Sequence, residues 1–223
     1  MQFDSSSGLF KMCEWLYRLA FLNLLAICFS IVGGVIFGVF PAITAMFVLN
    51  NKWLQGEGDF SITKEFWIAF KKYFFKSNLL GILIILTTIT LYIDFALVQN
   101  FNGILYYIIL SSSATVLVLS YTVLLYVFSL ITVFPQNSLI KQIRRAIQVS
   151  TLFPLQTLWM TLSLISFLFI CWVIPGFAFL FVGSGLSFIA MYFSNFAFKR
   201  IEDHKNKHSS VSILSERGVI HSE

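Results

Sequence analysis

Residues 19–49 read LAFLNLLAICFSIVGGVIFGVFPAITAMFVL, a run without a single charged side chain. As one helix this run would be about 46 Å long, whereas the hydrocarbon core of a bilayer is about 30 Å thick. It is therefore too long for one straight span. Gly33, Gly34 and Pro41 favour a bend, and a division there into a re-entrant hairpin is the alternative that the sequence leaves open.

Small side chains recur at every fourth position along this run, at Ser30, Gly34, Gly38 and Ala42. On a continuous helix they would share one stripe, where the backbone of another helix can approach closely. The stripe predicts a helix-packing seam. Ordinary packing inside the chain is the favoured interpretation, and docking of a partner helix is the alternative.

The composition indicates an integral membrane protein. Apolar residues make up 58% of the 223 residues and charged residues only 11%, whereas soluble domains carry about 25% charge. Helices satisfy their own backbone polar groups and therefore suit a lipid environment. We expect an all-α integral membrane protein, a bundle of about five transmembrane helices with two basic amphipathic cytoplasmic segments.

The apolar runs define one helical membrane domain over residues 19–198, between an N-terminal interfacial segment at 1–18 and a polar, mobile cytoplasmic tail at 199–223. Interfacial Trp15 and Tyr17 just before the first run support the first boundary. The five predicted spans lie at about 19–49 (bent), 79–98, 104–134, 155–173 and 177–198.

Two basic amphipathic segments lie between these spans. The first, a predicted helix over residues 62–76, alternates aromatic side chains with Lys64, Lys71 and Lys72, and the second carries Lys141, Arg144 and Arg145 on one helical face. Segments held between spans are expected to contact lipid headgroups and not nucleic acid. Membrane lipid is thus a predicted partner.

The distribution of Lys and Arg predicts the orientation of the chain in the cell membrane. With five spans, only Lys11 and Arg18 of the fifteen Lys and Arg residues lie outside. This asymmetry predicts an external N-terminus and a cytoplasmic C-terminus. The hairpin alternative for 19–49 would bring Lys11 and Arg18 inside as well.

Catalytic motifs are missing from the sequence. It contains no HExxH, GxSxG or P-loop pattern and no paired intramembrane carboxylates, so no enzyme activity, cofactor or metal is predicted. Asp94 is the ionisable residue inside the predicted spans, and it is a polar candidate together with Ser111, Ser112 and Ser113. A solvated interfacial Asp and serines bonded to their own helix are the ordinary explanations.

Three stretches, RLAFLNLLAICFS, GVFPAITAMFVLNNKWLQGEGDF and FWIAFKKYFFKSNLLG, resemble the opening half of the YesL family of small bacterial membrane proteins, found chiefly in Firmicutes. YVFSLITVFPQNSLIKQIRRAIQVSTLFP is similar to the family's second inner segment, with Ser129 where a proline is common. The matching positions of the first half are Arg18, Asn23, Phe40, Pro41, Ala42, Trp53, Gly56, Phe66, Phe70, Phe74, Asn78 and Gly81.

The resemblance implies no catalytic residue, but the genes of the family often neighbour those for carbohydrate uptake and breakdown. The leading hypothesis is therefore a non-enzymatic accessory or regulatory component linked to carbohydrate uptake, with a sugar-transporter subunit or a second copy of the chain as partner. The alternative is a small-molecule binding or transport subunit that docks through the small-residue seam, as the substrate-binding components of energy-coupling-factor transporters do. An intramembrane enzyme using Asp94 is the third class.

Overall fold

The computed structural model describes the backbone of residues 8–58, 60–101 and 103–220, and the side chains of residues 12–58, 60–101 and 103–201. Within these residues the chain forms seven α-helices and no strand, which confirms the all-α class. The helices are α1 (Gly8–Val32), α2 (Ile36–Leu54), α3 (Ile62–Val98), α4 (Ile104–Val133), α5 (Leu139–Leu152), α6 (Pro154–Val173) and α7 (Pro175–Ile220).

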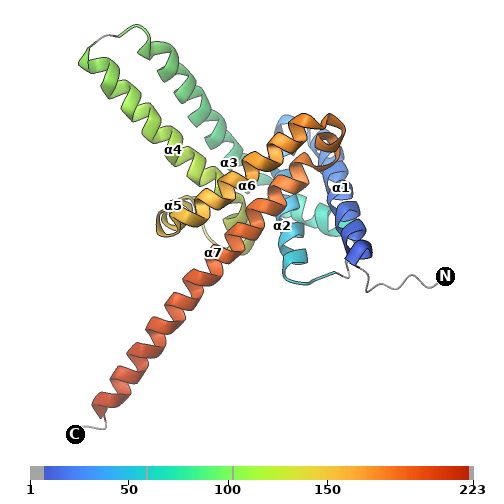
Figure 1. Cartoon of the computed structure of the whole chain (residues 1–223), viewed down its shortest axis with the longest axis vertical. Helices are drawn as coiled ribbons and strands as arrows, with labels where there is room; N and C mark the ends of the chain where they lie inside the picture. Colours follow the sequence, from blue (N-terminus) through green and yellow to red (C-terminus); the bar gives the residue numbers. More distant parts are fainter. Residues whose placement is uncertain (1–7, 59, 102, 221–223) are drawn as a thin grey trace, which may run out of the picture.

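Six of these helices pair into three helical hairpins: α1 with α2, α3 with α4, and α6 with α7. The three turns, at residues 33–35, 99–103 and 174, contain no Lys or Arg. In Figure 1 the turns lie toward the top of the molecule, whereas the start of α1 and the end of α7 lie lower. The short helix α5 connects the second hairpin to the third.

The structure divides the run 19–49 at Gly33-Gly34 into two helices, in place of one bent span. Gly34 has a φ of 80°, a conformation that suits glycine because it has no Cβ. The two helices then meet closely, since a Cβ on Gly38 would lie 2.3 Å from the carbonyl oxygen of Ser30. Pro41 lies inside α2 and does not end it.

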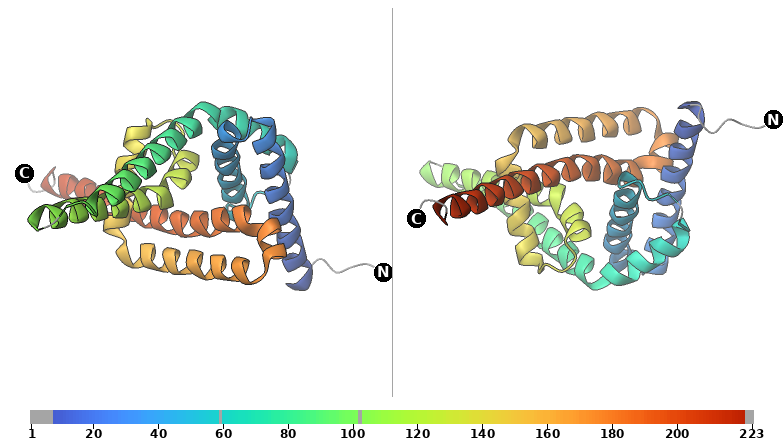
Figure 2. Two further views of the ribbon diagram at one scale, coloured as in Figure 1. Left: turned by 90° about the horizontal axis from the view of Figure 1, so that it is seen from above. Right: turned by 90° about the horizontal axis from the view of Figure 1, so that it is seen from below.

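The helix α3 runs without interruption through the predicted boundary between a surface helix at 62–76 and a span at 79–98. No Gly or Pro occurs between residues 62 and 80, so nothing in the local sequence ends the helix. Ser77, at this boundary, is buried and shares a hydrogen bond of 2.6 Å with Thr44 of α2. The helix instead bends along its length, as Figure 2 shows.

Within the described part of the chain, five helical segments are long and apolar enough to cross a membrane, the number predicted. They are Met12–Val32, Ile62–Val98, Ile104–Val133, Pro154–Val173 and Pro175–Ile201. The helix α2 is not among them, although the prediction placed its apolar half in the first span. It packs against α1, α3 and α7 instead.

Helices form both ends of the described chain. Trp15 belongs to α1 and packs on Trp53 and Phe188, at ring-centroid distances of 6.2 Å and 5.2 Å, so it is not a free interfacial ring. Residues 1–7 of the predicted interfacial segment lie outside the described residues. At the other end, α7 continues as a helix to Ile220.

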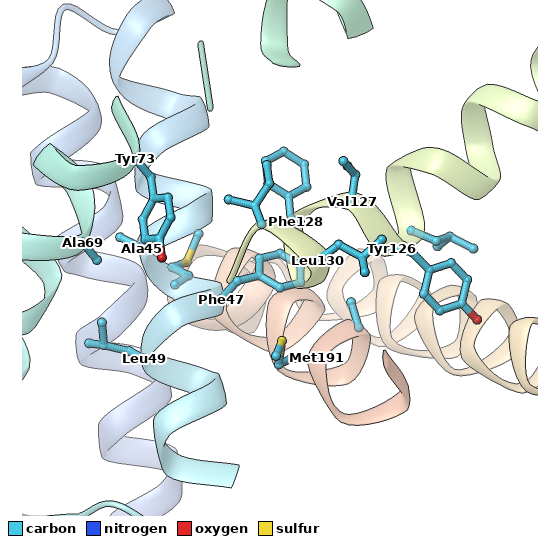
Figure 3. Close-up of a cluster of buried hydrophobic side chains, with 14 of the residues drawn as sticks. Ala45, Phe47, Leu49, Ala69, Tyr73, Tyr126, Val127, Phe128, Leu130 and Met191 are labelled. Atoms are coloured by element: carbon cyan, nitrogen blue, oxygen red, sulfur yellow. The ribbon is translucent and has the colours of Figure 1, made fainter. Parts of the chain in front are cut away.

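The central core lies where α2, α4 and α7 meet (Figure 3). Phe47 of α2 stacks on Phe128 of α4 at 5.6 Å, and Leu130 and Met191 are buried beside them. Every residue from 125 to 131 is buried, whereas the preceding residues of α4 are largely exposed. The core therefore buries only the C-terminal part of α4, and the preceding part of this helix stays largely exposed.

Candidate functional site

Asn23 of α1 binds the backbone of α7 with both ends of its amide. Its Nδ2 donates to the carbonyl oxygen of Phe179 at 2.8 Å, and its Oδ1 accepts from the backbone N–H groups of Gly183 and Ser184 at 3.1 Å and 3.3 Å. A Cβ on residue 183 would lie 2.7 Å from that oxygen, which explains glycine there. The amide thus anchors α1 to the first half of α7.

Two neighbouring asparagines of α2 continue this contact along α7. Asn50 is fully buried, and its Nδ2 donates to Ser187 Oγ at 2.8 Å. Asn195 Nδ2 donates to Asn51 Oδ1 at 2.9 Å, two turns further along α7. Hydrogen bonds between membrane helices stabilise the fold by about 0.6 kcal/mol on average. The polar seam, defined as Asn23, Asn50, Asn51, Ser184, Ser187 and Asn195, therefore joins the first hairpin to the third.

The polar seam was not predicted from the sequence. Asn23 was matched to the family only by resemblance, and Asn50 and Asn51 directly follow the predicted first span, which ends at residue 49. A signal exists, because Ser184, Ser187 and Asn195 recur at helical spacing inside an apolar helix. Such a stripe indicates a face that meets another polar surface, but it does not name the partner helix.

The small-residue seam is not a continuous surface. Its four residues lie on different elements, because α1 ends at Val32. Ser30 is on α1, Gly34 is in the turn, and Gly38 and Ala42 are on α2. Gly38 and Ser30 pack against each other, and Ala42 is 1% exposed. The favoured interpretation, packing inside the chain, agrees with this arrangement. Docking of a partner helix along one continuous stripe does not agree with it, because the four small residues do not lie on one helix.

Of the intramembrane polar candidates, the structure brings only two together. Ser113 Oγ lies 3.2 Å from Asp94 Oδ2, across the pair formed by α3 and α4. Ser111 and Ser112 are exposed, and their hydroxyls donate to carbonyl oxygens of their own helix. Asp94 is partly exposed about one turn before the end of α3. This pair links α3 to α4.

The six basic candidates are all exposed. They are Lys64, Lys71 and Lys72 on the first half of α3, and Lys141, Arg144 and Arg145 on α5. A seventh cation, Lys76, joins the two segments, because its Nζ donates to the carbonyl oxygens of Pro135 and Asn137 in the loop before α5. Lys76 therefore connects the first basic segment to the loop that precedes the second, across 59 residues of sequence.

Two grooves lie around the first hairpin. One, of about 390 Å³, runs between α1, α2 and α7 and is lined by aliphatic side chains with Asn23 and Ser30. The other, of about 520 Å³, lies between the end of α1 and the start of α3, where Lys64 and Trp67 contribute to its wall. Both are predominantly apolar and open toward the outside of the helix bundle.

Metal-binding side chains do not gather within the part of the chain that the structure describes: no group of three His, Cys, Asp or Glu side chains occurs there. The side chains of the three histidines, at 204, 208 and 221, lie outside this part. Cys13 and Cys28 are exposed and Cys171 is buried, and all three are free thiols.

Comparison with known proteins identifies the family of the chain. The profile of the family described as "Protein of unknown function, DUF624" matches residues 19–95. The chain is 31% identical over 206 residues to "Uncharacterized protein YteU" of Bacillus subtilis (strain 168), covering 92% of this chain and 91% of the relative. It is 30% identical over 208 residues to "Uncharacterized protein YesL" of the same organism, covering 91% and 95%. The chain belongs to the YesL-like DUF624 family. No solved structure matches it.

The DUF624 profile covers most of α1, all of α2 and nearly all of α3. Family positions in this region make contacts that fix those helices. Phe40 packs on Gly81, where a Cβ would lie 2.2 Å from the ring, and the guanidinium of Arg18 lies over Trp53 at 5.6 Å. Phe66 and Phe70 pack on Phe29 of α1. These DUF624 residues therefore have a structural role.

Proposed function

We propose that this DUF624 protein is a non-enzymatic accessory component of carbohydrate uptake in the cell membrane, which acts by binding a sugar-transporter subunit. The link to carbohydrate rests on the family resemblance. The mode of action rests on the hairpin formed by α3 and α4. Of the described residues between 82 and 124, only Val98 is buried. We name residues 82–124 the arm.

The arm projects from the rest of the protein in Figure 1. It touches α6 at its base, where Tyr121 Oη donates to Thr161 Oγ1 at 2.9 Å. Exposed hydroxyl side chains, Thr88, Thr90, Ser111, Ser112 and Thr115, lie among its apolar residues. Small and hydroxyl side chains favour close packing of membrane helices. The arm is therefore the part of the molecule best suited to contact the spans of another membrane protein.

Site-specific photocrosslinking tests this proposal with a matched control. Leu117 on the arm is 56% exposed and Leu162 on α6 is 57% exposed. A photoreactive phenylalanine is therefore equally accessible to neighbouring molecules at either position. In cells grown on polysaccharide, position 117 should form an adduct with a permease subunit of a sugar transporter, and position 162 should not. An adduct with a second copy alone, or equal adducts at both positions, would contradict the proposal.

A small-molecule binding subunit is the second candidate, and the groove of about 390 Å³ between α1, α2 and α7 favours it. The polar atoms of its lining residues are already engaged: Asn23 binds α7, and Ser30 Oγ donates to the carbonyl oxygen of Ala26. The groove consequently suits an apolar molecule better than a sugar. A rise in the unfolding temperature of the detergent-solubilised protein on adding oligosaccharide would favour this candidate over the accessory role.

A further inference from the structure

Apart from Glu65, which follows Lys64 and pairs with Lys52, the six exposed cations on α3 and α5 have no acidic residue near them in the sequence. Between Glu65 and Glu202 the chain contains one acidic residue, Asp94, and that residue lies near the turn at the far end of the arm. The ion pairs among the described side chains involve Arg18 and Lys52. The charge of the six cations is therefore not neutralised within this part of the protein.

Lys76 connects the two basic segments. It binds the carbonyl oxygens of Pro135 and Asn137 at 3.1 Å and 2.7 Å, and α5 begins two residues later. Lys72 lies one helical turn before Lys76, on the same side of α3. We define the basic surface as Lys64, Lys71, Lys72, Lys141, Arg144 and Arg145.

Aromatic rings hold three of these cations in place. Lys71 Nζ lies 4.7 Å from the centroid of the Trp67 ring, and Lys72 Nζ lies 5.2 Å from that of Tyr73. The guanidinium of Arg145 lies 4.9 Å from the centroid of Phe134. Amphipathic rings beside cations are typical of the level where lipid headgroups meet hydrocarbon. The basic surface thus has the composition of a membrane interface.

Strongly exposed apolar side chains alternate with the cations. Phe75 is 86% exposed and lies one turn from Lys71 and Lys72, while Ile140 is 80% exposed beside Lys141. A soluble acidic partner would leave such side chains in water. A bilayer takes them into its acyl region while its phosphates meet the Lys and Arg side chains. The mixture of charge and apolar surface therefore favours a lipid surface as the occupant.

We propose that the basic surface binds the phosphate groups of anionic phospholipids in the adjoining leaflet, and that Lys76 aligns α3 and α5 to do so. Each Lys or Arg close to an anionic leaflet is attracted to it, and salt screens the attraction. Phosphatidylglycerol should consequently be enriched next to this surface relative to phosphatidylcholine. The inference is independent of the transporter partner proposed above.

Trp67 reports the lipid beside the basic surface because it is 39% exposed and contacts Lys71. The intact protein is reconstituted with brominated phosphatidylglycerol or with brominated phosphatidylcholine at equal mole fraction, and the quenching of its tryptophan fluorescence is measured. The difference in quenching between the parent protein and Trp67→Phe isolates the signal of Trp67. At low salt, brominated phosphatidylglycerol should quench the fluorescence of Trp67 about threefold more strongly than brominated phosphatidylcholine does. Equal quenching by the two lipids would overturn the proposal.

Charge-removal variants connect this preference to the named residues. The variant K71Q/K72Q/R144Q/R145Q should lose the preference, whereas K205Q/K207Q/R217Q, which removes charge near the C-terminus, should keep it. Unchanged unfolding temperatures establish that both variants are folded. Persistence of the preference in the first variant would refute the assignment. Loss of the preference on adding inorganic phosphate, but not chloride of equal ionic strength, would identify soluble phosphate and overturn the lipid assignment.

Discussion

Lys76 Nζ lies 2.7 Å from the carbonyl oxygen of Asn137, so a cation of α3 binds the loop between α4 and α5. The same group donates to the carbonyl oxygen of Pro135. These carbonyls follow the C-terminal end of α4, where the helix dipole is negative and a cation is favourable. The contact joins the middle of α3 to the start of α5, and it determines how the basic surface is assembled.

Replacing Lys76 by methionine should therefore lower the stability of the protein. Hydrogen bonds to charged groups contribute about 1.5–3 kcal/mol when buried, and the partial exposure of Lys76 reduces the expected loss to about 1 kcal/mol. Thermal unfolding in detergent can be followed with a thiol-reactive dye on buried Cys171, in a C13S/C28S background. Lys72→Met, one turn away and exposed, is the control, and equal unfolding temperatures for the two variants would contradict the role of Lys76.

Gly38→Ala should destabilise the first hairpin. The new Cβ would lie 2.3 Å from the carbonyl oxygen of Ser30, and backbone atoms cannot yield as a flexible side chain can. Overpacking of this kind costs about 1–3 kcal/mol. Gly176→Ala is the matched control because nothing lies within 4 Å of its added Cβ. A stability of Gly38→Ala similar to that of the control would show that the two helices are further apart.

The bond between Asn50 and Ser187 should give a measurable coupling energy. A double-mutant cycle with Asn50→Ala and Ser187→Ala compares unfolding free energies of the single and double variants in detergent. We expect a coupling of about 0.6 kcal/mol, the average for polar pairs between membrane helices, and at most about 1.7 kcal/mol. Additive losses would mean that the two side chains act independently.

The division of 19–49 into two antiparallel helices predicts that the N-terminus lies on the same side of the membrane as residues 55–61, since Trp15 contacts Trp53. All fifteen Lys and Arg residues then lie on the cytoplasmic side. Single cysteines at Gly8, Gln55 and Asn100 in a cysteine-free background test this. A membrane-impermeant maleimide should label position 100 in intact protoplasts and the other two only after lysis. Labelling of position 8 in intact protoplasts would instead support the external N-terminus that the five-span model predicts.

Asp94→Asn should leave the protein stable and able to bind its partner. Ser113 Oγ can donate to the amide oxygen of an asparagine as it does to Asp94 Oδ2, so the link between α3 and α4 is retained. The unfolding temperature and the yield of the Leu117 adduct should both match those of the parent protein. A folded variant that forms no adduct would indicate that the charge of Asp94 is itself required.

The apolar composition and the spacing of charges determined the class of this protein. Runs such as 104–134 and 155–173 carry no charged side chain, and lipid requires each backbone polar group to be satisfied within its own segment, so such runs can only be helices. The exposure of the six basic candidates followed from the same reasoning, because Lys and Arg avoid the hydrocarbon core. Both conclusions depend on local chemistry.

The tertiary structure decided which segments meet. Gly34 permitted either a bend or a turn, and the close contact between Gly38 and Ser30 selects the turn. Ser77 and Thr44 bond across α3 and α2, which keeps α3 continuous where two elements were predicted. The polar seam and the contact of Lys76 with the loop before α5 join residues far apart in the chain. Helical periodicity tells which side chains share a face, but it does not tell which other face they meet.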